Sequence, residues 1–412
     1  MEFCSHRLAN GLEIVAECNP HARTTALGFF VKTGARDESP DVAGVSHFLE
    51  HMVFKGTARR SAADVNREFD ELGAHYNAFT SKEHTVYYAA VLPELTERTV
   101  DLLADIMRPA LRSEDFDTEK QVILEEIKMY EDQPPYGADE KCEAAHYGEH
   151  PLAHSVLGTV DSVGKLPVEK MRAYFESRYS PGNLVLAAAG KVDFDDLVRL
   201  ANTRCGDWAP MRTDRTLRPG QPHAEFRVLH KESSTLEYVM QLSMAPGATD
   251  EDRYAAKILA TVLGDDTGSR LYWALVDTGL AESAGVGHYD YQETGLFATS
   301  FNCEADNTAQ NLQIVRDILR QAEQDGIAAA EMFQAKNKIN SRVVLGSERP
   351  RVRLFTVGGN WIQRREYRSV RDDLDAVERV TIADLEAVLQ KYPLSVNTTF
   401  AVGPLQALEA PR

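Results

Sequence analysis

The apolar and polar positions at the start of the chain predict strands. Residues 7–17 alternate on either side of Asn10-Gly11, a dipeptide that strongly favours a tight β-hairpin turn. Residues 24–33, read TTALGFFVKT, are an almost continuous apolar run that ends before Gly34. A run of this length and composition is typical of a strand whose two faces are both buried.

Helices and strands are expected to alternate over the next eighty residues. Residues 61–73 begin with a serine suited to an N-cap and end with a glycine suited to a helix C-terminus. Two strands follow, over residues 74–80 and 86–91, and a helix is expected from Pro93 to about Met107.

A short helix that ends near Gly56 brings three ionisable side chains together. Residues 45–54 are apolar nearly all round, so the helix is expected to be buried. His47 and His51 lie one turn apart on one face, with Glu50 beside them. Buried ionisable groups need partners, and a Zn²⁺ ion would supply one, bound by two imidazoles while the carboxylate holds its water. The alternative is two histidines satisfied by hydrogen bonds and a glutamate on the surface.

A long helix expected over residues 114–132 places two carboxylates on its apolar side. At about 100° per residue, Glu119 and Glu126 fall within about 20° of each other, whereas Glu125 lies outside the arc. The apolar members of this arc are Val122, Ile123, Leu124, Ile127, Met129 and Tyr130. Inward carboxylates need an explanation. Either they pair with an arginine elsewhere in the fold, or Glu126 completes a His₂Glu zinc site and Glu119 supports it from behind.

The chain repeats itself at a spacing of 213 residues. Tyr179 and Tyr392 each follow a helical pattern and precede an apolar strand that ends in glycine, and Gly34 and Gly247 close similar apolar runs at the same spacing. We therefore predict an α+β protein with two homologous αβ domains, each a mostly antiparallel sheet packed with helices, related by internal duplication.

The predicted domains follow from this repeat. Residues 1–210 form the N-terminal zinc-binding domain, and residues 211–223, rich in proline, glycine and charge, form a linker. Residues 224–412 form the homologous C-terminal domain, which lacks a zinc motif of its own.

Composition excludes several classes of protein. The chain of 412 residues is 43% hydrophobic and 26% charged, as soluble globular proteins are. Its net charge of -18 disfavours non-specific binding to nucleic acid or to an anionic membrane. No apolar run approaches the roughly 18 to 20 residues that a membrane-spanning helix needs. We expect no nucleic-acid partner and no membrane span.

The cysteines indicate a reducing compartment. Five of them are scattered along the chain without a C-x-x-C pair: Cys4, Cys18, Cys142, Cys205 and Cys303. An odd, scattered set argues against a disulfide framework and against a cysteine zinc site. The N-terminus shows no secretory signal pattern, so a cytoplasmic location is expected unless a leader has been removed.

Three segments in order resemble the pitrilysin and mitochondrial processing peptidase family of zinc proteases. They are residues 47–57 (HFLEHMVFKGT), 74–85 (AHYNAFTSKEHT) and 119–134 (EKQVILEEIKMYEDQP), and the first holds the inverzincin motif H-x-x-E-H. The two-half layout and the YSPGNL segment at residues 179–184 match as well. The resemblance covers essentially the whole chain.

The resemblance implies a role for each residue of the site. It implies one Zn²⁺ per chain, bound by His47, His51 and Glu126, with Glu50 as the general base and Glu119 behind the ligands. Independently of the resemblance, helical spacing places Glu126, and not its neighbour Glu125, on the apolar side of the helix.

The resemblance also implies how substrate binds. Family members hold a peptide as an extra strand on a sheet edge near an Asn-Ala pair, which is Asn77 and Ala78 here. The alternative for Asn77 is an ordinary residue at the end of a strand.

One departure from the family concerns the second half. Many active relatives carry an arginine and a tyrosine that bind substrate, in a stretch like LREKRGLAY, whereas residues 275–283 read LVDTGLAES. A partner chain supplies the pair, or Arg270, Tyr272, Tyr289 or Tyr291 substitutes for it, or peptide turnover is weak. Small family members form dimers that enclose a chamber, which implies a homodimer, or a heterodimer with a related subunit that carries the pair.

The expected function is a zinc-dependent endopeptidase that hydrolyses peptides or unfolded segments. Two alternatives remain: a zinc-bearing structural subunit that depends on a partner or is not catalytic, and a peptide-binding protein in which the metal is structural. A structural zinc site is normally closed by four protein ligands, and the sequence offers three.

Overall fold

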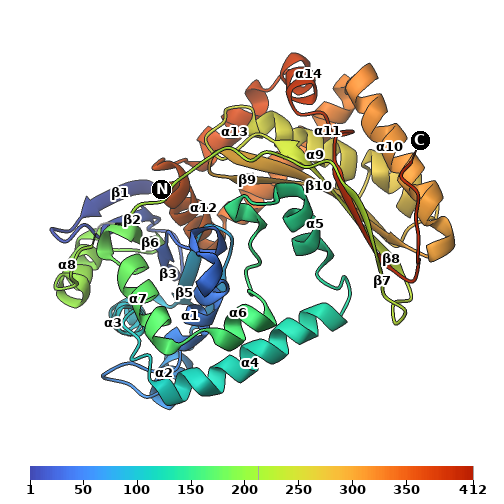
Figure 1. Ribbon diagram of the computed structural model, residues 1–412. Helices are drawn as coiled ribbons and strands as arrows, with labels where there is room; N and C mark the ends of the chain where they lie inside the picture. The colour runs from blue at the N-terminus through green and yellow to red at the C-terminus, as the bar shows by residue number, and fades with distance from the viewer. Residues whose placement is uncertain (212, 412) are drawn as a thin grey trace. The chain divides into compact units, whose positions relative to one another are not determined.

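The computed structural model describes residues 1–211 and 213–411, which form two compact units (Figure 1). The first unit comprises the described residues of Met1–Lys128, His154–Thr216 and Leu345–Arg368, and the second comprises those of Met129–Ala153, Leu217–Val344 and Ser369–Arg412. Arg212 in the predicted linker and Arg412 at the end of the predicted C-terminal domain lie outside the described residues.

The compact units are not continuous stretches of chain. Residues 129–153, from the first half of the sequence, belong to the second unit, and residues 345–368, from the second half, belong to the first. The predicted division into residues 1–210, 211–223 and 224–412 stays a prediction.

The first unit is built on a six-stranded, mostly antiparallel sheet in which only β2 and β6 run parallel. In spatial order its strands are β1 (Glu2–Arg7), β2 (Glu13–Cys18), β6 (Leu184–Gly190), β3 (Thr25–Val31), β5 (Thr85–Val91) and β4 (His75–Thr80). Strand β3 is buried at every position, as its apolar run predicts.

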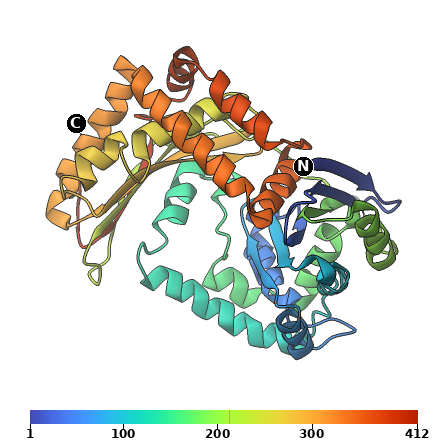
Figure 2. The same ribbon diagram turned by 180° about the vertical axis from the view of Figure 1, so that it is seen from behind.

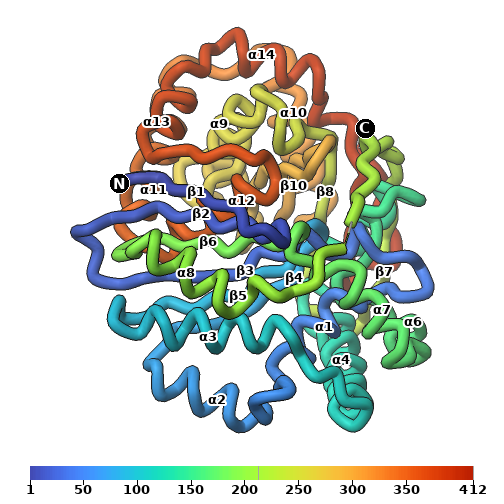
Figure 3. Tube along the Cα trace, turned by 90° about the vertical axis from the view of Figure 1, so that its left-hand side faces the viewer, coloured from blue at the N-terminus to red at the C-terminus, as the bar shows by residue number. Residues whose placement is uncertain are grey.

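Helices cover both faces of this sheet, as Figure 3 shows with α12 on one side and α3 and α8 on the other. Along β3, Phe29 faces the main core and Phe30 packs with Leu354 and Val357 of α12 (Pro350–Arg364). The main core receives side chains from α1 (Val45–Val53), α2 (Ala62–Glu71), α3 (Thr96–Ile106), α4 (Ser113–Asp132), α7 (Val168–Arg178) and α8 (Phe194–Cys205). The short helix α6 (Val160–Lys165) also contributes Val163.

The second unit repeats this topology with five strands, which confirms the predicted duplication. The order is β7 (Phe226–His230), β11 (Thr398–Gly403), β8 (Glu237–Ala245), β10 (Thr294–Cys303) and β9 (Ser283–Tyr291). The parallel pair β7–β11 corresponds to β2–β6, and the antiparallel pairs that follow correspond in the same order.

The second sheet is likewise covered on both faces (Figure 2). Helix α5 (Ala138–Tyr147) packs on one face, against residues such as Leu296 and Phe400. The other face is covered by α9 (Arg253–Gly264), α10 (Thr308–Asp325), α11 (Ala329–Ser347), α13 (Val370–Arg379) and α14 (Ile382–Lys391). Each sheet therefore takes the helix on its second face from the other half of the sequence.

Most local predictions are confirmed. Strands β1 and β2 form the predicted hairpin, with Arg7 opposite Glu13. Ser61 caps α2 by accepting a hydrogen bond from the Asp64 N–H, and Gly73 follows the helix with a φ of 55°. Helix α3 begins after a short 3₁₀ turn at Pro93–Leu95, three residues later than predicted.

The predicted apolar arc of α4 is wrong in part. Glu119, Ile123 and Ile127 are buried as expected, but Val122, Met129 and Tyr130 are 48%, 45% and 53% exposed. The buried positions follow a narrow stripe at spacings of three and four residues, so α4 contacts the core along one edge and leaves the flanks of the arc in solvent.

No helix among the described residues is both long enough and apolar enough to cross a membrane.

Gly358 of α12 offers a test of how tightly the helix from the second half packs on the first sheet. An added Cβ there would lie 2.4 Å from the Phe30 ring, whose side chain is buried, whereas a Cβ on Gly359 would meet nothing within 4 Å. We expect Gly358→Ala to lower the free energy of unfolding by about 1–3 kcal/mol. Gly359→Ala should be neutral or stabilising by up to about 1 kcal/mol. Urea denaturation measures both, and equal effects would contradict this packing.

Candidate metal centre

The position of α1 is fixed at its start by a buried carboxylate. The N-cap residue Gly44 has a φ of 90° and no side chain to cap the helix. Glu38 replaces that cap, because its carboxylate accepts hydrogen bonds from the N–H groups of Gly44 at 2.6 Å and Ser46 at 2.8 Å. Burial raises the pKa of Glu38 to about 8, and the two backbone hydrogen bonds oppose that shift.

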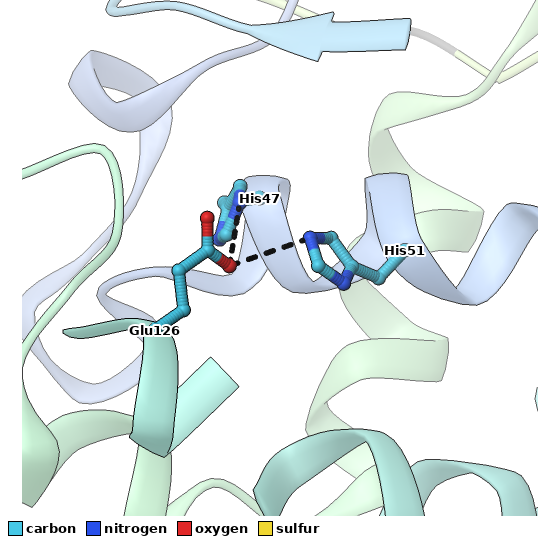
Figure 4. A group of neighbouring side chains, drawn as sticks. All are labelled: His47, His51 and Glu126. Atoms are coloured by element: carbon cyan, nitrogen blue, oxygen red, sulfur yellow. Dashed lines mark ion pairs between the residues drawn. The ribbon is translucent and has the colours of Figure 1, made fainter. Parts of the chain in front are cut away.

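Helices α1 and α4 bring the three predicted ligands together (Figure 4). Glu126 Oε2 lies 3.7 Å from His47 Nε2 and 3.6 Å from His51 Nε2. One ligand atom from each side chain lies within 4.8 Å of the others. No other group of three or more histidine, cysteine or acidic side chains is this close among the described residues.

The donor set fits zinc. Two imidazole nitrogens and one carboxylate oxygen are the ligands of many catalytic zinc sites, and ligand atoms of a tetrahedral Zn²⁺ lie about 3.4 Å apart. The observed separations are close to that value. Burial, and then the neighbouring His51, lower the pKa of His47 to about 3, so its imidazole is neutral and available as a ligand. Its Nδ1 is buried without a hydrogen-bond partner.

Glu119 orients the second histidine. His51 Nδ1–H donates a hydrogen bond to Glu119 Oε1 at 2.8 Å, which directs Nε2 toward Glu126. Burial alone would lower the pKa of His51, but its hydrogen bond to Glu119 and the nearby carboxylates raise it overall. Lys55 Nζ lies 2.5 Å from the other oxygen of Glu119, so this carboxylate bridges a lysine and a ligand.

Glu50 is held beside the ligands by the neighbouring strand. Thr80 of β4 donates a hydrogen bond from Oγ1 to Glu50 Oε2 at 2.7 Å. Burial raises the pKa of Glu50, and the Thr80 hydrogen bond and the charge of His51 oppose the shift. The charges of both His51 and Glu126 act on the pKa of Glu50, which is consistent with a position of the predicted base near the ligands.

Asn77 and Ala78 lie on β4, the edge strand of the first sheet next to α1. Asn77 is exposed, and its Oδ1 accepts a hydrogen bond from the Ala78 N–H at 2.9 Å. Among the described residues, Asn77 and Ala78 make no hydrogen bond to the three ligands, but Thr80 on the same strand connects this edge to Glu50.

The residues considered as substitutes for the absent arginine and tyrosine all lie in the second unit. Arg270 is bound by Glu331 at 2.8 Å, and Tyr291 donates a hydrogen bond to Glu143 at 3.4 Å. Tyr272 opens a five-residue π-helix, and Tyr289 is exposed on the edge strand β9.

Three residues that position the site were not predicted from the sequence. Lys55 stands four residues after His51, so its place one turn farther along could have been inferred from helical spacing. Glu38 and Thr80 reach α1 from a loop and from a strand, and no local pattern marks those contacts.

Comparison with known proteins agrees with the predicted resemblance. A model of the insulinase family, peptidase family M16, matches residues 13–160, and a model of the peptidase M16 inactive domain matches residues 165–339. An uncharacterized zinc protease of Mycobacterium leprae is 33% identical over 93% of this chain and 88% of its own length. The uncharacterized zinc protease YmxG of Bacillus subtilis is 31% identical over 94% of this chain and 96% of its own length.

Solved structures share the fold. A protease from Helicobacter pylori superposes with a TM-score of 0.91 at 21% identity, over 98% of this chain and 99% of that one. A peptidase M16 inactive domain from Pseudomonas fluorescens gives 0.92 at 18% identity, over the whole of both chains. With two matching domain models and relatives of this length and identity, the chain belongs to peptidase family M16, whose members it resembles across both αβ domains.

Proposed function

We propose that this protein is a zinc-dependent endopeptidase that hydrolyses peptides or unfolded segments. The observation that supports this most is the convergence of His47, His51 and Glu126 with Glu50 beside them. Three protein ligands leave a position for water or substrate, as in catalytic rather than structural zinc sites.

The chemistry divides between the metal and the chain. One Zn²⁺ bound by the three ligands would supply Lewis acidity toward the scissile carbonyl and toward water. Glu50 would take the proton from the attacking water and deliver it to the leaving amine. Thr80 holds the Glu50 carboxylate in place, and Glu119 keeps His51 in the tautomer whose Nε2 faces the ligand cluster.

The edge of β4 suits a peptide that binds as an added strand. The Ser81 N–H donates to the His84 carbonyl at the turn, so alternation of the ladder directs the main-chain groups of Tyr76, Ala78 and Thr80 away from β5. A peptide paired along this edge would pass Thr80 and thus Glu50. Main-chain pairing would give an affinity largely independent of sequence. Without a bound peptide, the Ala78 N–H donates a hydrogen bond to the side-chain oxygen of Asn77.

The proposal includes a dimer that encloses a chamber, either of identical chains or with a related subunit that supplies the absent arginine and tyrosine. A second candidate function is a zinc-bearing subunit that is inactive without that partner, and the LVDTGLAES stretch favours it. Cleavage of unstructured peptides by the purified, zinc-loaded chain at rates typical of enzymes would exclude this second candidate.

Replacement of the proposed base separates catalysis from metal binding. We expect Glu50→Gln to lower kcat at least about 10²-fold, because the general base is lost, while zinc stays bound at one ion per chain. Cleavage is measured by mass spectrometry on a peptide mixture, and zinc by elemental analysis. The matched control is Glu125→Gln, since Glu125 is an exposed glutamate of α4 paired with Lys128. A Glu50→Gln variant that cleaves like the control would refute the assignment.

Replacing a zinc ligand should weaken zinc binding more than replacing Glu119, which orients a ligand. His47→Ala leaves two protein ligands and should lose stoichiometric zinc. Glu119→Gln keeps all three ligands but weakens the orientation of His51, so the dissociation constant should rise about 10–100-fold. Competition with a chromophoric chelator measures both. Unchanged affinity in both variants would place the metal elsewhere, and Glu125→Gln again serves as the control.

A proline on the sheet edge tests the proposed peptide site. Ala78→Pro removes an N–H that points away from β5, so the ladder stays intact and the melting temperature should change little. The KM for unstructured peptides should rise about 10-fold, because a main-chain hydrogen bond of about 1 kcal/mol or more is lost to the substrate. The control Asn77→Pro removes an inward ladder bond and should instead destabilise the fold. An unchanged KM in a folded Ala78→Pro variant would argue against strand addition here.

A further inference from the structure

The outermost hairpin of the first sheet carries two cysteines on the same face. In the register of β1 and β2, Cys4 lies opposite Ala16 and Glu2 lies opposite Cys18. Residues that face each other across a ladder, and those two positions away, share one side of a sheet. Cys4 and Cys18 are therefore diagonal neighbours, and the nearby Cys4 contributes to raising the pKa of Cys18.

This pair differs from the remaining cysteines in exposure. Cys4 and Cys18 are half-buried, whereas Cys142, Cys205 and Cys303 are buried. Cys18 also lines a cavity of about 730 Å³ together with Met1, Glu2, Lys191 and Asp193. A small molecule of the size of a peptide thiol can thus reach the part of the hairpin that carries this pair, whereas the other three thiols are buried.

The hairpin can also adjust to a covalent bond. Strand β1 is the edge of the sheet and pairs only with β2. A disulfide requires Cα atoms less than about 7 Å apart, whereas diagonal neighbours in an antiparallel pair lie about 7–8 Å apart. The bond therefore needs a small shift of β1 toward Cys18, which an edge strand with one neighbour can make.

We propose that Cys4 and Cys18 are a dithiol that a small disulfide of the glutathione class oxidises to an intrachain disulfide. The reaction is thiol–disulfide exchange in two steps. The Cys4 thiolate attacks one sulfur of the oxidant, which forms a mixed disulfide and releases one thiol. The Cys18 thiolate then attacks the Cys4 sulfur of the mixed disulfide and releases the second thiol. The protein loses two electrons and two protons, and the oxidant becomes two thiols.

The surroundings of Cys18 set the order of these steps. Burial, the contact with Cys4 and the charges of Glu2 and Asp193 raise the pKa of Cys18 to about 12. Cys18 is thus a slow nucleophile toward a molecule from solution. It acts in the second step, where the mixed disulfide is held beside it.

The Cys4–Cys18 disulfide would hold the edge strand β1 against β2. The bond closes a loop from residue 4 to residue 18, which constrains the unfolded chain and ties β1 to the sheet. The oxidised protein should therefore melt at a higher temperature than the reduced protein, by a few degrees.

The test is incubation of the full chain with oxidised glutathione at mildly alkaline pH, followed by an acid quench and intact-mass analysis. Wild type should lose two hydrogens and regain them with a reductant. Cys18→Ser should accumulate one glutathione adduct, mapped to Cys4, because the second step is blocked. Cys4→Ser should remain unmodified over the same period, and Cys303→Ser should behave as wild type.

Three results would overturn the proposal. They are a wild type that stays reduced, a wild type that stops at a stable adduct, and a Cys4→Ser variant that reacts as fast as Cys18→Ser. The thermal melt of oxidised and reduced wild type provides a second measurement, and an equal or lower melting temperature after oxidation would contradict the fastening of β1.

Discussion

The burial of α1 is the constraint on which the site depends. A helix that is apolar on nearly every side must lie in a core, and this one carries His47, Glu50 and His51 with it. Each of these groups loses water on burial, and each is compensated by a contact from another element. Glu119 accepts from His51, Thr80 donates to Glu50, and Glu126 lies between the two imidazoles.

The buried N–H groups at the start of α1 also need hydrogen-bond partners from other elements. Gly44 gives the chain the left-handed turn that α1 needs but offers no side chain for the free N–H groups. Glu38 accepts two of these, and Tyr174 is hydrogen-bonded to the Ser46 hydroxyl at 2.9 Å. The arrangement fixes the first turn of α1, and through it the direction of His47.

Two sheets with both faces buried explain the exchange of segments between the halves. An αβ sheet that is apolar on both sides needs a helix on each. In both units the second face is covered by a helix from the other half of the sequence, α12 for the first sheet and α5 for the second. Each half thus contributes a helix to the core of the other half's sheet. Among the described residues, the group of three potential metal ligands lies in the first half.

Sequence patterns predicted much of the local structure and the residues of the candidate site, because helical spacing and alternation depend on neighbours in the chain. The spacing of residues 47–51 and the choice of Glu126 over Glu125 follow from the period of an α-helix alone. The 213-residue repeat likewise indicated a duplicated αβ fold. No local sequence pattern predicted the contacts between distant segments of the chain. Tertiary packing decided that Val122, Met129 and Tyr130 stay in solvent and that α5 and α12 each pack on the sheet of the other half. It also decided that Glu38 and Thr80 contact α1, since each of these features depends on which surfaces meet after folding.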